Sequence, residues 1–117
     1  MRMGVLAEGD SLSSYVADDF GHAPYILVVD PDTMDVTAIK NGHTRAEGAG
    51  MKVADELIAL GVDVVVTGGI GPHGYNMLTG AGITVSFDED GTVEECVKRV
   101  KERLDRMKRY QDQPDRP

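Results

Sequence analysis

Short apolar runs alternate with polar, glycine-containing segments along this chain, and they predict five strands. Four of the runs have the continuity of buried strands: Gly4–Ala7, Tyr25–Val29, Val62–Thr67 and Ile83–Phe87. A fifth strand, Val36–Ile39, follows the turn sequence Asp30-Pro31-Asp32, so we expect it to form a hairpin with the strand before it. Two longer polar stretches, Glu8–Ala23 and Asn41–Gly50, are predicted to be loops.

Apolar residues at helical spacing predict three helices. The first begins at Met51 and ends before Gly61, a residue type favoured at helix C-termini. The second is short and spans about Tyr75–Thr79. The third opens with Thr92 and Glu95, which match a T-x-x-E capping box. Its core-facing stripe consists of Val93, Val97, Val100, Leu104 and Met107.

The element order β-β-β-α-β-α-β-α predicts an α/β fold, a five-stranded mixed sheet with helices covering both faces in three α/β/α layers. If the first, third, fourth and fifth strands run parallel, their carboxyl ends share one edge with the loop that enters the second strand. Open α/β sheets bind ligands at that edge. His22, His43 and His73, which are all the histidines of the chain, fall in loops at this edge.

The length and composition fit one compact domain. The chain has 117 residues, 41% of them hydrophobic, and we assign the domain to residues 1–109 and a disordered tail to 110–117. A single cysteine excludes an internal disulfide framework and a metal site built from several thiolates of one chain. No apolar run approaches the ~20 residues of a membrane span, and no signal-peptide pattern opens the chain. We therefore expect a cytoplasmic protein without a membrane partner.

Charge is distributed unevenly along the chain, whose net charge is −8. Residues 1–97 hold sixteen acidic and four basic side chains, whereas residues 98–117 hold eight basic and four acidic ones. Because a nucleic-acid surface needs clustered basic residues, the acidic body predicts no nucleic-acid partner. The basic stretch Lys98–Arg109 is interpreted as the solvated face of the last helix.

The glycine-rich loop Gly69–Gly74 follows a strand and precedes a helix, as in a dinucleotide-binding fingerprint with Asp88 as the acidic residue. The helix behind it is barely two turns long, which argues against a dinucleotide, and no lysine follows the glycines as in a phosphate-binding Walker loop. Small residues and free N–H groups at a helix N-terminus still favour an anion. Glu47–Gly50 provides a second such helix start on the same edge. A small-anion or nucleotide-binding regulatory module that uses Gly69–Gly74 is therefore one alternative function.

The three loop histidines suggest a second alternative, a mononuclear metal enzyme. Neutral imidazole suits Fe, Cu, Zn or Ni, but the spacing of His22, His43 and His73 matches no compact metal motif. No Ser-His-Asp or Cys-His constellation has a recognisable local signature. Cys96 is expected to be a buried, unreactive thiol, and Met51 is expected to lie in the core.

Three segments together resemble a known protein family. They are Phe20–Tyr25 (FGHAPY), Gly48–Gly50 (GAG) and Gly61–Pro72 (GVDVVVTGGIGP). On these motifs the chain is identified as a member of the dinitrogenase iron–molybdenum cofactor biosynthesis family, which includes NifX, NafY and the carboxy-terminal domain of NifB. The resemblance covers about residues 2–105. Many members have His before the matching Phe, Arg after the next glycine and Asn after the matching Pro; this chain has Asp19, His22 and His73 there.

The resemblance implies a ribonuclease-H-like fold without nuclease activity, and the non-enzymatic binding or carriage of an anionic metal–sulfur cluster. The cluster would be an iron–molybdenum cofactor precursor or a molybdenum–copper sulfide, such as the orange protein of sulfate-reducing bacteria holds without thiolate links. The implied partner is a protein that donates or accepts the cluster. The expected contact residues are Phe20, Gly21, His22, Arg45, Gly48, Ala49, Gly50, Gly69, Ile70, Gly71, Pro72 and His73, with His22, His43 and His73 as candidate metal ligands.

Overall fold

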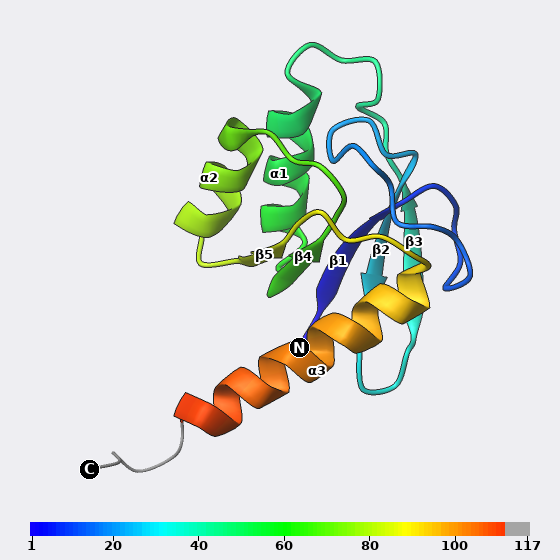
Figure 1. The fold of residues 1–117 in the computed structure, drawn as a ribbon. Coiled ribbons are helices and arrows are strands. Elements are labelled where there is room, and N and C mark those ends of the chain that lie inside the picture. Colours follow the sequence, from blue (N-terminus) through cyan, green and yellow to red (C-terminus); the bar gives the residue numbers. More distant parts are fainter. Residues whose placement is uncertain (112–117) are drawn as a thin grey trace.

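The computed structural model describes residues 1–111 and contains the eight expected elements in the expected order (Figure 1). The strands are β1 (Met3–Ala7), β2 (Tyr25–Val29), β3 (Val36–Lys40), β4 (Val64–Val66) and β5 (Thr84–Ser86). The helices are α1 (Ala49–Ala59), α2 (Pro72–Gly80) and α3 (Val93–Gln111). Helix α2 thus starts at Pro72, earlier than predicted, because the fixed φ of proline suits the first helical position.

The strands form one mixed sheet in the order β3-β2-β1-β4-β5. β2 is antiparallel to both of its neighbours, β1 and β3, whereas β1 and β4 are parallel, as are β4 and β5. Strands β1, β3, β4 and β5 therefore run in one direction, which confirms the predicted α/β fold with a mixed sheet. Their carboxyl ends and the start of β2 form one edge of the sheet, which we call the rim.

Helices cover both faces of the sheet (Figure 1). Helices α1 and α2 pack against one face, where the core contains Leu6, Ile26, Leu57, Val65 and Leu78. Helix α3 packs against the other face, over Met3, Val5, Leu27, Val66 and Val97. All five residues of β1 are buried, as expected for a central strand enclosed on both faces.

The buried face of α1 differs from the predicted one. Val53, Ala54 and Leu57 are fully buried, whereas Met51 is 49% exposed. At 3.6 residues per turn, Met51 points roughly 130° away from the centre of that buried face, so its expected place in the core is wrong. Met51 lies instead in the first turn of α1, at the rim.

Helix α3 begins with the predicted capping box. The Glu95 amide donates to Thr92 Oγ1 at 3.2 Å, and the Thr92 amide donates to Glu95 Oε1 at 3.1 Å, which holds the pKa of Glu95 below its ordinary value. The helix outruns the sheet, so Met107 is 52% exposed and its predicted core position is wrong. The helix also continues through Gln111, past the predicted domain boundary at residue 109, because no residue there breaks it and basic residues favour its last turn. The rest of the predicted tail lies outside the described residues.

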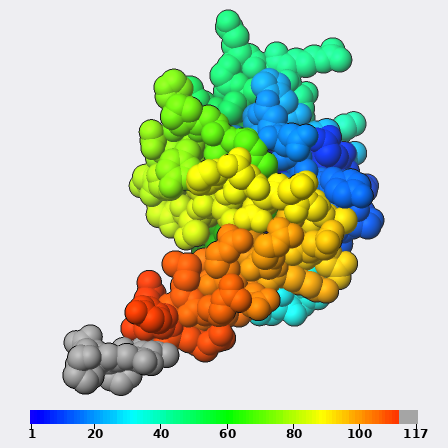
Figure 2. Space-filling model, in the orientation of Figure 1, coloured from blue at the N-terminus to red at the C-terminus, as the bar shows by residue number. Residues whose placement is uncertain are grey.

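Both ends of the described chain lie away from the rim. β1 begins at the opposite edge of the sheet, and α3 runs from the rim past that edge, as its orange and red end shows (Figures 1 and 2). Within residues 1–111, no helix combines the length and hydropathy that a membrane crossing requires.

Candidate functional site

The polar segment Glu8–Ala23 returns across the rim and is tied to the loop after β4. The Gly68 amide donates to the Ala17 carbonyl at 2.9 Å. The Phe20 amide donates to the Gly69 carbonyl, also at 2.9 Å. The backbones approach so closely that a Cβ on Gly68 would lie 2.4 Å from the Ala17 oxygen. Part of the predicted loop is therefore fixed, and it carries Phe20 to the start of α2.

Close packing also brings the start of α1 to this place. A Cβ on Gly21 would lie 2.9 Å from the Gly50 nitrogen, so the two backbones touch. The Phe20 side chain is 2% exposed and packs beneath α2, where a Cβ on Gly74 would lie 3.3 Å from its ring. Small residues at these contacts let one loop and two helix N-termini converge.

The convergence leaves an open cavity of about 230 Å³ at the rim. Its lining consists of Asp19, Phe20, Gly21, His22, Gly48, Gly50, Met51, Gly71, Pro72, His73 and Gly74. Eight of the twelve expected contact residues are among them: Phe20, Gly21, His22, Gly48, Gly50, Gly71, Pro72 and His73. The sequence motifs at Phe20, Gly48 and Gly71 therefore meet at one site, the rim cavity.

Both helices present unpaired backbone donors to the rim cavity. Neither N-cap residue, Gly48 of α1 nor Gly71 of α2, supplies a side-chain cap. The first free N–H groups of the two helices, at residues 49–50 and 73–74, have no acceptor in the described part of the chain. Gly48 has φ 66°, a left-handed conformation that favours glycine at the entrance of α1. Uncapped N–H groups and the positive ends of two helix dipoles make this a place for an anion.

Two of the three histidines reach the rim cavity. Both line it, His22 from the loop before β2 and His73 from the first turn of α2, where the sequence predicted a loop. His22 Nδ1 lies 2.8 Å from Asp19 Oδ2, a contact that orients the ring and leaves Nε2 for another ligand. The Gly21 amide donates to the other oxygen of the same carboxylate at 3.0 Å, which fixes the Asp19 side chain in turn. Asp19 therefore serves as a support for His22.

The third histidine lies elsewhere, so the predicted grouping of three histidines is wrong. His43 Nε2 is 3.2 Å from Glu56 Oε2, in a separate hollow that Lys52 and Asp55 also line. Among residues 1–111, no group of three or more His, Cys, Asp or Glu side chains could hold a metal ion. His43 follows β3, the edge strand, which lies three strands away from β4 in the sheet.

Four other expected contact residues do not line the rim cavity. Ala49 is buried under the first turn of α1, and Gly69 is engaged in the backbone tie with the Phe20 segment. Ile70 faces a different hollow, with Tyr75 and Phe87. Arg45 is exposed in the loop before α1. Because Arg45 does not line the cavity, the role left to it is an electrostatic one.

Three lining residues are not among the expected contacts: Asp19, Met51 and Gly74, the last of which belongs to the glycine-rich loop already considered for an anion. Met51 follows Gly48–Gly50 directly and lies in the first turn of a helix without a side-chain cap. This position could have identified it as a residue that lines the cavity. Cys96 is confirmed as a buried free cysteine, and burial raises the pKa of its thiol. The sulfur donor available at the rim cavity is therefore a thioether, not a thiolate.

Comparisons with known proteins show the family of the chain and structures of similar fold. The family model described as "Dinitrogenase iron-molybdenum cofactor" matches residues 1–103. The apo form of the orange protein from Desulfovibrio gigas is 38% identical, with a TM-score of 0.81 over 86% of this chain and 87% of that one. A putative NifB protein from Thermotoga is 32% identical, with a TM-score of 0.73 over 86% of this chain and 87% of that one. None of the curated proteins matches.

Proposed function

The chain belongs to the dinitrogenase iron–molybdenum cofactor family, and we propose that it binds and carries an anionic metal–sulfur cluster in the rim cavity without catalysing a reaction. One observation carries the proposal: two uncapped helix N-termini converge on a cavity that also holds two imidazoles and a thioether. The cluster is cargo, received from one protein and passed to another.

Local charge explains how an acidic protein could hold an anion. The net charge of −8 repels an anionic cluster at long range, but salt screens that repulsion beyond about 10 Å at 0.1 M. Each helix N-terminus contributes about half a positive charge, felt mainly within its first turn. The amides of the lining residues Gly50, His73 and Gly74 would donate to the sulfides of the cluster.

The side-chain donors favour a cluster that contains a soft metal. Imidazole suits copper and iron, and a thioether favours Cu(I). His22, His73 and Met51 offer these two donor types, which supports a molybdenum–copper sulfide over an iron–molybdenum cofactor precursor. The Asp19 carboxylate would fix the tautomer and the orientation of His22, as second partners of metal-bound histidines do.

The alternatives find less support. The Gly69 amide donates to the Asp18 carbonyl at 2.6 Å, so the first glycine of this loop has no free N–H group for a nucleotide phosphate. A mononuclear metal enzyme would need three side-chain ligands and an open position, and His43 is engaged with Glu56 outside the rim cavity.

Removing both rim histidines should weaken cluster binding by at least ~10-fold. Copper and tetrathiomolybdate are titrated into the protein, and binding is followed by visible absorption and metal analysis. The His22→Ala/His73→Ala variant loses two donors, while substitutions of exposed residues such as these usually change the free energy of unfolding by under ~0.5 kcal/mol. His43→Ala is the matched control and should bind like the wild type. Equal binding by the double variant, or a loss caused by His43→Ala, would contradict the assigned site.

Reversing the charge of Arg45 should weaken the same binding roughly three- to tenfold at low salt. Arg45 is exposed before α1 and acts only through its charge, so the difference should vanish near 1 M salt, where screening acts within about 3 Å. Arg109→Glu, at the far end of α3, makes the same change in net charge away from the rim and should have no effect. Tight binding by Arg45→Glu at low salt would show that Arg45 contributes nothing.

A further inference from the structure

A second feature of the rim is an exposed aromatic face. Tyr75 and Phe87 are 37% and 49% exposed, and their rings meet edge to face with centroids 5.9 Å apart. Together with Ile70 they line an open hollow of about 330 Å³. Exposed aromatic pairs over a hollow are typical of protein-binding hot spots. We call Ile70, Tyr75 and Phe87 the aromatic face.

The backbone that presents Phe87 is held firmly. The Asp88 amide donates to the Gly68 carbonyl at 2.9 Å, and the Glu89 amide donates to the Thr67 carbonyl at 3.0 Å. Asp88 itself has φ 56°, an uncommon conformation for a residue with a side chain. The loop that carries Phe87 is therefore held in place by hydrogen bonds, and the ring is exposed in this fixed conformation.

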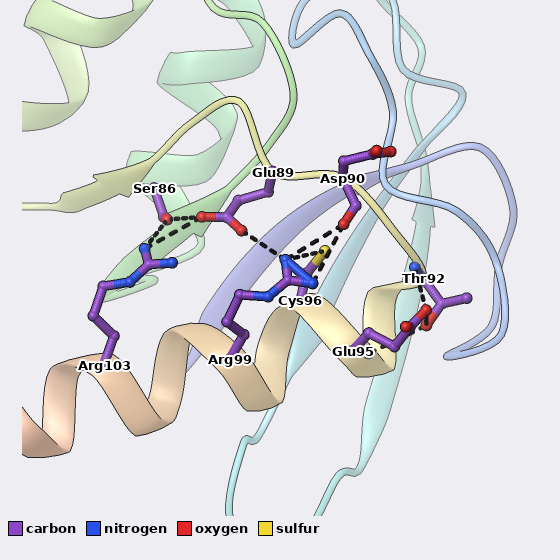
Figure 3. A network of polar contacts seen from close by, with 8 residues as sticks. All are labelled: Ser86, Glu89, Asp90, Thr92, Glu95, Cys96, Arg99 and Arg103. Atoms are coloured by element: carbon purple, nitrogen blue, oxygen red, sulfur yellow. Dashed lines mark hydrogen bonds and ion pairs between the residues drawn. The ribbon is translucent and has the colours of Figure 1, made fainter.

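Polar contacts with α3 fix the same loop from below (Figure 3). The Glu89 carboxylate is only 7% exposed, and it lies 3.3 Å from both Arg99 and Arg103 of α3. The Ser86 hydroxyl also donates to this carboxylate, at 2.5 Å. A buried carboxylate that holds two arginines anchors the loop to a helix of the core. The aromatic face is thus preorganised, which lowers the entropy lost when a partner binds.

Three exposed carboxylates lie on the two chain segments next to Phe87. Asp88 and Asp90 are exposed on the loop that carries Phe87, and Asp18 is exposed on the segment that packs against Gly68. In residues 1–111, no lysine or arginine side chain forms an ion pair with any of these three. The complementary surface is an apolar anchor ringed by basic side chains. Anionic lipids and nucleic acids would be repelled.

The aromatic face borders the rim cavity without being part of it. Tyr75 follows His73 by two residues in the first turn of α2, which places it roughly 200° further around the helix. A protein bound to Tyr75 and Phe87 would therefore lie on the opposite side of the first turn of α2 from the cluster in the rim cavity. We propose that the aromatic face docks a protein with a basic surface and an apolar anchor, and, resting on the proposed function, that this protein is the one that exchanges the cluster.

The test uses the full chain without cargo, so that it does not depend on cluster binding. A peptide with one leucine flanked by arginines is titrated into the ¹⁵N-labelled protein at low salt, and a peptide with glutamates in place of the arginines is the control. We expect amide shift changes centred on Ile70, Tyr75 and residues 87–90, with none from the acidic peptide. Phe87→Ala should weaken binding at least ~10-fold, and Asp90→Lys should weaken it at low salt only.

Tyr110→Ala is the matched control, because Tyr110 is 77% exposed at the end of α3, and it should leave peptide binding unchanged. Phe87→Ala should still take up copper and tetrathiomolybdate like the wild type, so failure of the cargo proposal and failure of the docking proposal are separable. Equal peptide binding by Phe87→Ala, or shift changes centred elsewhere, would overturn the docking proposal. Analytical ultracentrifugation provides a further test. If the wild type forms a dimer and Phe87→Ala abolishes it, a second copy of the chain occupies the aromatic face, and the docking proposal is overturned.

Discussion

Replacing Phe20 with alanine is expected to lower the free energy of unfolding by about 3–5 kcal/mol, the usual cost of removing a fully buried phenylalanine ring. Phe20 is 2% exposed and is the largest fully buried side chain of the core. It packs between the sheet and α2, directly below the rim cavity. Urea unfolding followed by circular dichroism measures the change.

The chain provides its own control, because it has only one other phenylalanine. Phe87 is 49% exposed, and Phe87→Ala should cost no more than about 1 kcal/mol, roughly the worth of its contact with Tyr75. If Phe20→Ala left stability unchanged but abolished cluster uptake, the ring would act as a cargo contact, as its motif first suggested. In the structure the ring belongs to the core and also lines the floor of the rim cavity, so the two measurements separate its structural role from a contact with the cargo.

Gly68→Ala is the second substitution with a large expected effect, a loss of about 3 kcal/mol. The new methyl group would lie 2.4 Å from the Ala17 oxygen and 2.7 Å from the Asp18 Cα. Both are backbone atoms, so no side chain can rotate away, and the tie between the Phe20 segment and the β4 loop must open. Overpacking of this kind commonly costs 1–3 kcal/mol, about the upper end when backbone must move.

Gly80→Ala separates this collision from the general effect of adding a methyl group. Gly80 ends α2, and a Cβ there would meet nothing within 4 Å. Because alanine favours a helix over glycine by up to about 1 kcal/mol, this variant should be as stable as the wild type or more so. Hydrogen exchange should locate the damage in Gly68→Ala, with faster exchange of the Phe20 amide. Unchanged exchange there would contradict the proposed role of the tie.

The sheet and its rim could be predicted because each strand is a short apolar run bounded by turn residues. Alternation of those runs with helices implies parallel strands, and parallel strands place their following loops on one edge. The same reasoning predicts that the glycine-rich starts of α1 and α2 lie on this edge, where both line the rim cavity. These features depend on local patterns alone.

The sequence did not reveal how far apart the loops lie along the rim. The loops after β3 and β4 share the edge, but in the strand order β3-β2-β1-β4 these two strands lie three spacings apart, about 14 Å. His43 and His73 are therefore on the same edge and in different sites. The tie of the Phe20 segment to Gly69 was equally hidden, because isolated backbone bridges between irregular segments leave no periodic pattern. The prediction that Met51 lies in the core was wrong because a few apolar residues in a short helix do not determine which of its faces is buried.

The position of the N-terminus decides how this fold can be attached to something else. Because β1 enters the sheet at the edge opposite the rim, a tether at Met1 would leave the cavity and the aromatic face pointing outward. Immobilisation through this end on a sensor surface should present both binding surfaces to solution. The same geometry allows the fold to be appended to a larger protein as a forward-facing module, with its binding edge unobstructed by the junction.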